Sequence, residues 1–311
     1  MYVLPVLTYG LELFNLKQGD IQSLESFQIK TFRQLLGLPN NTPSCALLTL
    51  LGALPVSGII DKKILSMLGN ILRSSSSVEY SILMRQLAVK NIKSSSWIIL
   101  ARRTLSRYQL PSLFALTKSI PTKATWKRIV VATVHRYWED VISHQLPLYP
   151  SLRYMSHQYI VGQLHPAISS VKPTLKDVRR CASKLRLLTG TYTLQGNRPR
   201  FNQFNCDACP LCMTATETRE HFICECLALS EIRVNSLQIV QQTLRTTKLD
   251  YRHLTSPDLT ALIIDPKAFI LRSDVVHTVD PELIESATRH MVYQLHSRRR
   301  SLLGGSTVHT Q

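Results

Sequence analysis

The sequence has little of what marks membrane proteins and disulfide-rich secreted proteins. Its best apolar stretch, residues 46–60, is shorter than the roughly 18 to 20 residues that a transmembrane helix needs, and Pro55 and two glycines interrupt it. The first residues do not have the charged leader and small-residue cleavage site of a signal peptide. The seven cysteines are an odd number in a chain of 311 residues. We therefore expect no membrane span and no disulfide framework.

Acidic residues are also scarce, with 20 Asp and Glu against 37 Lys and Arg, for a formal net charge of +17. Residues 51–200 hold 23 basic and 5 acidic side chains, a net charge of +18, whereas residues 1–50 and 201–311 have net charges of 0 and −1. A positive field on this scale is typical of proteins that bind a polyanion, nucleic acid first and an anionic membrane surface second. A merely solvated basic surface is the alternative.

Five of the seven cysteines fall within 21 residues, which favours a metal site over cysteines that serve as small buried hydrophobes. Three of them and a histidine form a Cys-x2-Cys-x8-His-x4-Cys pattern, made by Cys209, Cys212, His221 and Cys226. Three thiolates and one imidazole complete a tetrahedral zinc site and leave no position for a reactive water. We predict one structural zinc ion. Cys206 and Cys224 are substitutes in second place.

Apolar residues at helical spacing predict a mainly α fold, made of irregular helical bundles and a small zinc-stapled knuckle. Between residues 45 and 72, three glycines and Pro55 predict short helices rather than one. Caps and stop signals predict further helices over residues 20–36, 126–145, 174–190 and 227–249 and from Asp280 onward. We expect four regions: a helical region 1–75, a basic helical middle 76–172, a basic helix plus knuckle 173–245, and a helical extension 246–311 with a disordered tail.

The predicted helix before the cysteines is amphipathic. Its apolar residues repeat at three and four positions and should face the core: Leu175, Val178, Ala182, Leu185 and Leu188. Basic residues occupy the opposite side, which we expect to face solvent, and two more follow the helix. These candidates for phosphate contacts are Arg179, Arg180, Lys184, Arg186, Arg198 and Arg200. Such residues position a nucleic-acid strand through its backbone, although many basic helices only present a solvated face.

Three groups of residues together resemble one known family. The first is Leu4-Pro-Val-Leu-Thr-Tyr9-Gly10 with Leu24-Glu-Ser-Phe-Gln28 and Leu35-Leu36-Gly37-Leu38-Pro39. The second is Leu185-Arg-Leu-Leu-Thr-Gly190, and the third is Cys209-Pro-Leu-Cys212 with Glu217-Thr-Arg-Glu-His221, Cys226 and Ser230-Glu-Ile-Arg233. They resemble, in turn, the thumb, the helix end before the zinc motif, and the C-terminal Cys-Cys-His-Cys motif of non-LTR (LINE-type) retrotransposon reverse transcriptases.

The resemblance implies a structural zinc held by the same four ligands, and a region that binds RNA or target DNA beside the polymerase domains of a parent element. It also implies a nuclear location with a cytoplasmic ribonucleoprotein stage. Polymerisation needs closely placed carboxylates for two metal ions, and the paired Asp-Asp of the family's palm occurs nowhere in this sequence. We therefore expect a fragment that lacks the palm, has no enzymatic activity of its own and takes no small-molecule substrate.

Two other functions stay open. One is a zinc-stapled scaffold that contacts the polymerase domains, with an incidental positive field. The other is a restriction-like endonuclease, which some relatives carry after the zinc motif, because Asp258, Asp265 and Lys267 imitate its metal-binding pattern. Only six residues separate the two aspartates, which is short for two adjacent strands, and those six residues look buried.

Overall fold

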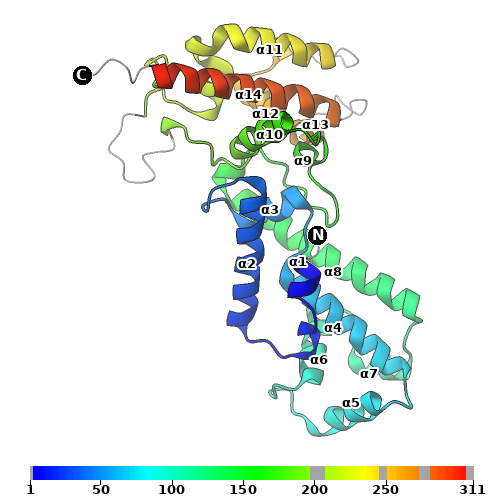
Figure 1. The fold of residues 1–311 in the computed structure, drawn as a ribbon. Coiled ribbons are helices and arrows are strands. Elements are labelled where there is room, and N and C mark those ends of the chain that lie inside the picture. Colours follow the sequence, from blue (N-terminus) through cyan, green and yellow to red (C-terminus); the bar gives the residue numbers. More distant parts are fainter. Residues whose placement is uncertain (1–2, 197–206, 245–250, 273–280, 306–311) are drawn as a thin grey trace. The chain divides into compact units, whose positions relative to one another are not determined.

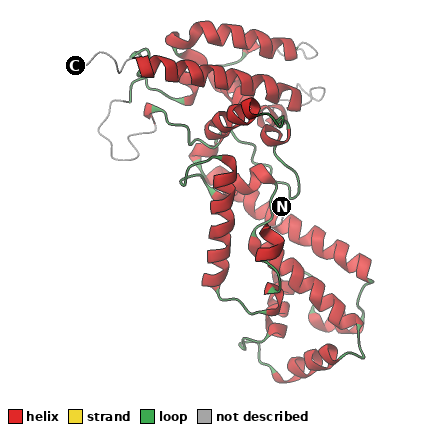
Figure 2. Ribbon diagram, in the orientation of Figure 1, coloured by secondary structure: helices red, strands yellow, loops and turns green. Residues whose placement is uncertain are grey.

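The computed structural model describes residues 3–196, 207–244, 251–272 and 281–305. Helices dominate these ranges, which contain no β-strand and only an isolated bridge between Ala208 and Thr216 (Figure 2). The predicted mainly α fold is confirmed.

The chain folds into two compact units, each assembled from separate segments. The first unit consists of Met1–Phe32, Gly52–Ser143 and Tyr159–Gly162. The second consists of Arg33–Leu51, His144–Gln158 and Gln163–Gln311.

The first unit has one hydrophobic core, built mainly by its longer helices. Its helices are α1 (Val3–Leu7), η1 (Leu11–Leu13), most of α2 (Gln18–Leu36), α4 (Val56–Arg73), α5 (Val78–Val89), α6 (Trp97–Arg107), α7 (Leu113–Lys118) and nearly all of α8 (Lys123–Gln145). Leu65 of α4, Ile98 of α6 and Val130 of α8 are fully buried in this core. Residues on both sides of the boundary expected at position 75 therefore share a single core.

The apolar segment 45–72 differs from its prediction. It forms α3 (Ser44–Leu51) and then one continuous 18-residue helix, α4, in which Gly58 and Gly69 are interior positions. A Cβ on Gly58 would lie only 2.6 Å from Nε1 of Trp138, and the indole of Trp126 occupies the corresponding space at Gly69. The two glycines admit two tryptophan rings of α8 and do not end the helix, which the local sequence could not reveal.

In the second unit, helices from distant parts of the sequence pack around α14 (Figure 1). Its helices after α3 are η2 (Leu146–Leu148), η3 (Pro150–Leu152), α9 (Pro166–Ser169), α10 (Leu175–Leu188), η5 (His221–Glu225), η6 (Leu227–Leu229), α11 (Ser230–Thr243), η7 (Tyr251–His253), α12 (Ser256–Ile264), α13 (Pro266–Arg272) and α14 (Pro281–Gly305). The packing of α14 against both α10 and α11 places the residues before and after the cysteines in one body.

The orientation of α10 corrects two expectations. Leu175 and Val178, expected in the core, are 68% and 52% exposed. Lys184, expected to face solvent, has 0% exposure because its ammonium group pairs with Glu285 and donates to Thr288 Oγ1 at 2.6 Å, both on α14. Asp177 is also buried, and Arg289 of α14 binds its carboxylate with both Nε and Nη2. Partners on α14 thus set which face of α10 is buried.

No single helix in the described residues is long and apolar enough to cross a membrane. The consecutive helices α3 and α4 reach that length and hydropathy only when counted together across the break between them.

Candidate metal centre

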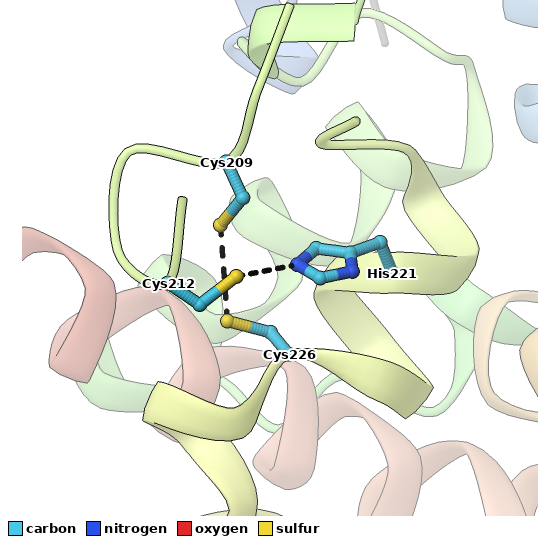
Figure 3. Close-up of side chains that lie close together, drawn as sticks. All are labelled: Cys209, Cys212, His221 and Cys226. Carbon is cyan, nitrogen blue, oxygen red and sulfur yellow. Dashed lines mark hydrogen bonds between the residues drawn. The ribbon is translucent and has the colours of Figure 1, made fainter. Parts of the chain in front are cut away.

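The first two candidate ligands lie on a tight turn. Met213 N donates to Cys209 O at 2.8 Å, and Cys209 N donates to Ala215 O at 2.7 Å, so the chain folds back directly after Cys212. Met213 has a φ of 57°, in the left-handed region that glycine adopts more readily. This turn points the sulfur atoms of Cys209 and Cys212 into the same space (Figure 3).

Of the other two ligands, His221 begins a short π-helix and Cys226 directly follows it. Cys226 lies five positions after His221, and in an α-helix the two residues would be about 140° apart around the axis. The residues instead form η5, and Cys226 N donates to His221 O at 2.8 Å, closing the wider turn. Thr218 caps the start of this segment, because its hydroxyl accepts from His221 N at 3.1 Å. The π turn brings His221 and Cys226 to the same side.

The four side chains form one compact cluster (Figure 3). Their ligand atoms all lie within 4.8 Å of one another. Cys209 Sγ is 3.8 Å from Cys226 Sγ, and Cys212 Sγ is 3.3 Å from His221 Nε2. Cys209, His221 and Cys226 are buried, whereas Cys212 is partly exposed. Four soft or borderline donors at this spacing can hold one metal ion.

The local electrostatics prepare some of these groups for metal binding. Burial would raise the pKa of Cys212, but hydrogen bonds, with Thr214 first, outweigh it and lower that pKa to about 6. Burial, followed by the neighbouring Cys209 sulfur, raises the pKa of Cys226 to about 12. One thiol therefore ionises readily, while the other needs the positive charge of an ion to lose its proton.

Glu225 supplies a carboxylate behind the histidine. The Nε2 atom of His221 faces the sulfur atoms, while its Nδ1 lies 3.9 Å from Glu225 Oε2. A carboxylate on this side favours a proton on Nδ1 and leaves Nε2 free as a ligand. Sequence reasoning missed this role, although the four-residue spacing from His221 was visible.

Cys224, one of the two substitute ligands, does not join the cluster. Cys224 Sγ lies 3.3 Å from Thr260 Oγ1 and 3.6 Å from Ser256 O, both on α12, and burial raises its pKa to about 11. Cys206 lies outside the described residues.

The segment before His221 anchors the knuckle to the rest of the second unit. Glu217 is fully buried, and Arg299 of α14 binds both of its oxygens, at 2.7 and 2.9 Å. The Arg219 guanidinium donates to two backbone carbonyls, and Glu220 accepts from Arg153 and Tyr154. These charged side chains therefore position the candidate metal ligands.

Arg233 fixes the other end of the site. This buried side chain of α11 donates from Nε to Ile223 O at 2.9 Å and from Nη2 to Cys226 O at 2.5 Å. The Arg233 guanidinium thus binds the backbone of the candidate ligand Cys226 and joins α11 to the cluster.

The candidate phosphate contacts have different environments. Arg179 and Arg186 are exposed and Arg180 is half-buried on α10, and the Arg186 guanidinium donates to Gly37 O. The expectation that Lys184 contacts phosphate is wrong, because its side chain is buried with Glu285 and cannot reach a phosphate. Arg198 and Arg200 lie outside the described residues.

A second cluster of ionisable side chains was not predicted. His165, Asp265 and Glu285 bring three potential ligand atoms within 4.8 Å, and all are buried. However, His165 Nδ1 accepts from Ala167 N at 3.2 Å, so the ring proton belongs on Nε2, which faces Asp265 Oδ2 at 3.3 Å. A metal on Nε2 would place that proton against the Ala167 N–H. The arrangement suits a hydrogen-bonded core better than a metal site.

The residues of the nuclease pattern lie on α12 and α13 and at the junction between these helices. Asp258 is exposed in the first turn of α12, where its carboxylate accepts from the Thr255 hydroxyl at 2.6 Å. Asp265 is fully buried and accepts from the backbone N–H groups of Ser156 and Ala268, at 2.6 and 3.1 Å. Lys267 follows in α13. Asp258 belongs to neither cluster of metal-ligating side chains found among the described residues.

Comparisons with protein-family models, with curated proteins and with solved structures give no match to this chain. The metal-ligating cluster and the basic surface residues are therefore the observations on which its function rests.

Proposed function

We propose that Cys209, Cys212, His221 and Cys226 bind one structural zinc ion. Three sulfur atoms and one imidazole nitrogen are a donor set that zinc prefers, and four protein ligands fill a tetrahedral site. The ion would join the Cys209–Cys212 turn to η5, whose Phe222 and Ile223 are buried in the second unit. Zinc affinity would then contribute on the order of 10 kcal/mol to the folding of this part of the chain.

Native mass spectrometry of the full chain tests the zinc site. We expect one zinc ion in the wild type and none in Cys212→Ser or His221→Ala. Cys224→Ser is the matched control, because Cys224 is two residues from Cys226 but contacts Thr260 instead. A folded wild type without zinc, or equal zinc loss in Cys224→Ser, would overturn this assignment.

We further propose that the zinc-stapled region binds nucleic acid, RNA or DNA, as part of a larger retroelement reverse transcriptase. The observation that supports this most is a Cys3His cluster with no fifth ligating group among the described residues, in the same unit as α10, on which Arg179 and Arg186 are exposed. Net positive charge in both units adds support: the first holds 16 basic and 7 acidic residues and the second 21 and 13. Polyanion binding makes use of such a distributed field.

Salt dependence of binding tests this function. Five arginines remain as candidates after Lys184 is removed, so the slope of log affinity against log salt should be near −4.5 on duplex DNA and near −3.5 on a single strand, as rough values. Fluorescence anisotropy with labelled RNA and DNA of mixed sequence measures it. A flat salt response, or no binding at low salt, would refute nucleic-acid binding.

One observation favours the scaffold as a second candidate. Val6, Tyr9 and Phe14, all within one short N-terminal segment of the first unit, are 75%, 85% and 61% exposed, and exposed apolar side chains that gather in one region are typical of a protein-binding surface. A protein partner would cover them. Under this alternative, Val6→Ser with Phe14→Ser should reduce self-association in sedimentation velocity and leave RNA affinity unchanged.

A further inference from the structure

A basic groove lies between α10 and α14. Its volume is about 640 Å³, and both helices contribute residues to its walls. It is lined by Arg179, Ala182, Ser183, Tyr293, His296, Ser297, Arg300 and Ser301. The lining contains two guanidinium groups, three hydroxyls, an imidazole and a phenol, and no carboxylate.

The two arginines of the groove keep their charge available. Neither Arg179 nor Arg300 forms an ion pair with a described carboxylate, whereas Arg299, beside them, is neutralised by Glu217. The pKa of His296 is lowered by burial first, and then by repulsion from Arg300, Arg186 and Arg299. The positive field of these guanidinium groups therefore reaches this residue of the groove. This region would therefore gain from an anion.

The neutral His296 supplies one more donor. Its Nδ1 lies 2.7 Å from the hydroxyl of Tyr192. Arg299 can only donate to the Tyr192 oxygen, so the Tyr192 proton goes to His296 Nδ1, and the ring proton of His296 lies on Nε2. The groove then combines fixed positive charge, an N–H and three hydroxyls, the groups with which proteins hold phosphate oxygens.

We propose that this groove binds backbone phosphate of a single nucleic-acid strand, an inference that rests on the proposed nucleic-acid-binding function. Arg179 and Arg300 would grip phosphate oxygens from opposite walls, since a guanidinium fork matches their geometry. Tyr293 in the same lining offers a ring on which a base can stack, a feature that a site for free phosphate would not need. The serine hydroxyls and His296 would complete the donor set.

The test measures binding of the full chain to a fluorescein-labelled single-stranded RNA of about 20 nucleotides, long enough to span a site of this size. The variants are Arg179→Ala, Arg300→Ala and Tyr293→Leu. Arg298→Ala is the matched control, because Arg298 is exposed on the same helix but does not line the groove. Circular dichroism and zinc content establish that each variant is folded.

Replacement of either groove arginine by alanine should lower the RNA affinity several-fold. It should also make the salt slope shallower by about 0.7, the share of one phosphate contact on a single strand. Tyr293→Leu should lower the affinity about five-fold or more with no change of slope, since stacking involves no counterion release. Arg298→Ala should have little effect on either quantity.

Three results would contradict the proposed phosphate binding in the groove, and each has a distinct meaning. Equal losses in all three arginine variants would mean a diffuse field, with the proposed function intact. Inorganic phosphate binding that Arg179→Ala and Arg300→Ala abolish, with RNA affinity unchanged in both variants, would mean a site for free phosphate. Absence of RNA binding by the wild type at low salt would remove the proposed function and this inference together.

Discussion

Replacement of Lys184 by Met should strongly destabilise the second unit, although the sequence places this lysine on a basic helix face. Lys184 and Glu285 both have 0% exposure, and the ammonium group is the partner of Glu285 Oε2. Glu285 Oε1 has no hydrogen-bond partner among the described residues. Loss of the lysine therefore leaves a buried carboxylate without compensation.

The expected cost is about 3–5 kcal/mol, the usual penalty for removing one member of a buried ion pair. That is a large part of the roughly 5–15 kcal/mol that stabilises a typical domain. The double variant Lys184→Met with Glu285→Leu removes both charges and should regain most of this loss, since apolar replacement of a buried pair is often close to neutral.

The cost should also depend on pH in a defined direction. Burial chiefly raises the pKa of Glu285 above its ordinary value of 4.5, and without Lys184 it should rise further. A carboxyl whose pKa is higher in the folded state favours folding at low pH, and this contribution is lost as pH rises above 4.5. Lys184→Met should therefore be least destabilising near that pH and progressively more so towards neutral pH.

Urea unfolding followed by circular dichroism, with wild type and both variants at several pH values, measures these quantities. RNA affinity of the double variant provides a separate check and should equal that of the wild type, because Lys184 does not reach solvent. A single-variant cost below about 1 kcal/mol, the scale of an exposed pair, would contradict the buried pair. So would a cost that falls as pH rises.

Three further predictions concern other parts of the fold. Gly69→Ala should cost about 1–3 kcal/mol in thermal unfolding, because its Cβ would meet the ring of Trp126, whereas Gly19→Ala in α2, with no atom within 4 Å of its Cβ, should be neutral or stabilising. Met213→Gly should keep zinc and raise stability by up to about 1 kcal/mol, since glycine adopts the observed φ of 57° without strain; a loss of stability in denaturant titration would argue against that turn. Asp265→Asn should cost about 2–3 kcal/mol by urea unfolding at neutral pH. Burial of the Asp265 carboxyl is outweighed by the neighbouring His165 and by its hydrogen bonds, which hold its pKa below 3.8, so the cost should shrink as pH falls below that value. An unchanged unfolding midpoint would show that the Asp265 carboxylate does not stabilise the fold.

Local signals in the sequence determined the helical character and the candidate metal ligands. Thr174 begins α10 by accepting from Asp177 N, and Gly190 ends that segment with a φ of 68°. These features depend on residues a few positions apart, so a pattern can predict them. The spacing of the four ligands likewise identified a cluster that the structure assembles within 18 residues.

Only the tertiary structure decided which polar side chains are enclosed and which charges stay free. Lys184 and Glu285 are 101 residues apart, and Arg299 and Glu217 are 82 apart, so no local pattern connects them. Burial of a charge depends on finding a partner across the core, because an uncompensated ion would be too costly there. The sequence alone specified a basic helix before a candidate metal site, whereas the packing of α10 against α14 enclosed one of its cations and left Arg179 and Arg300 in the lining of an open groove.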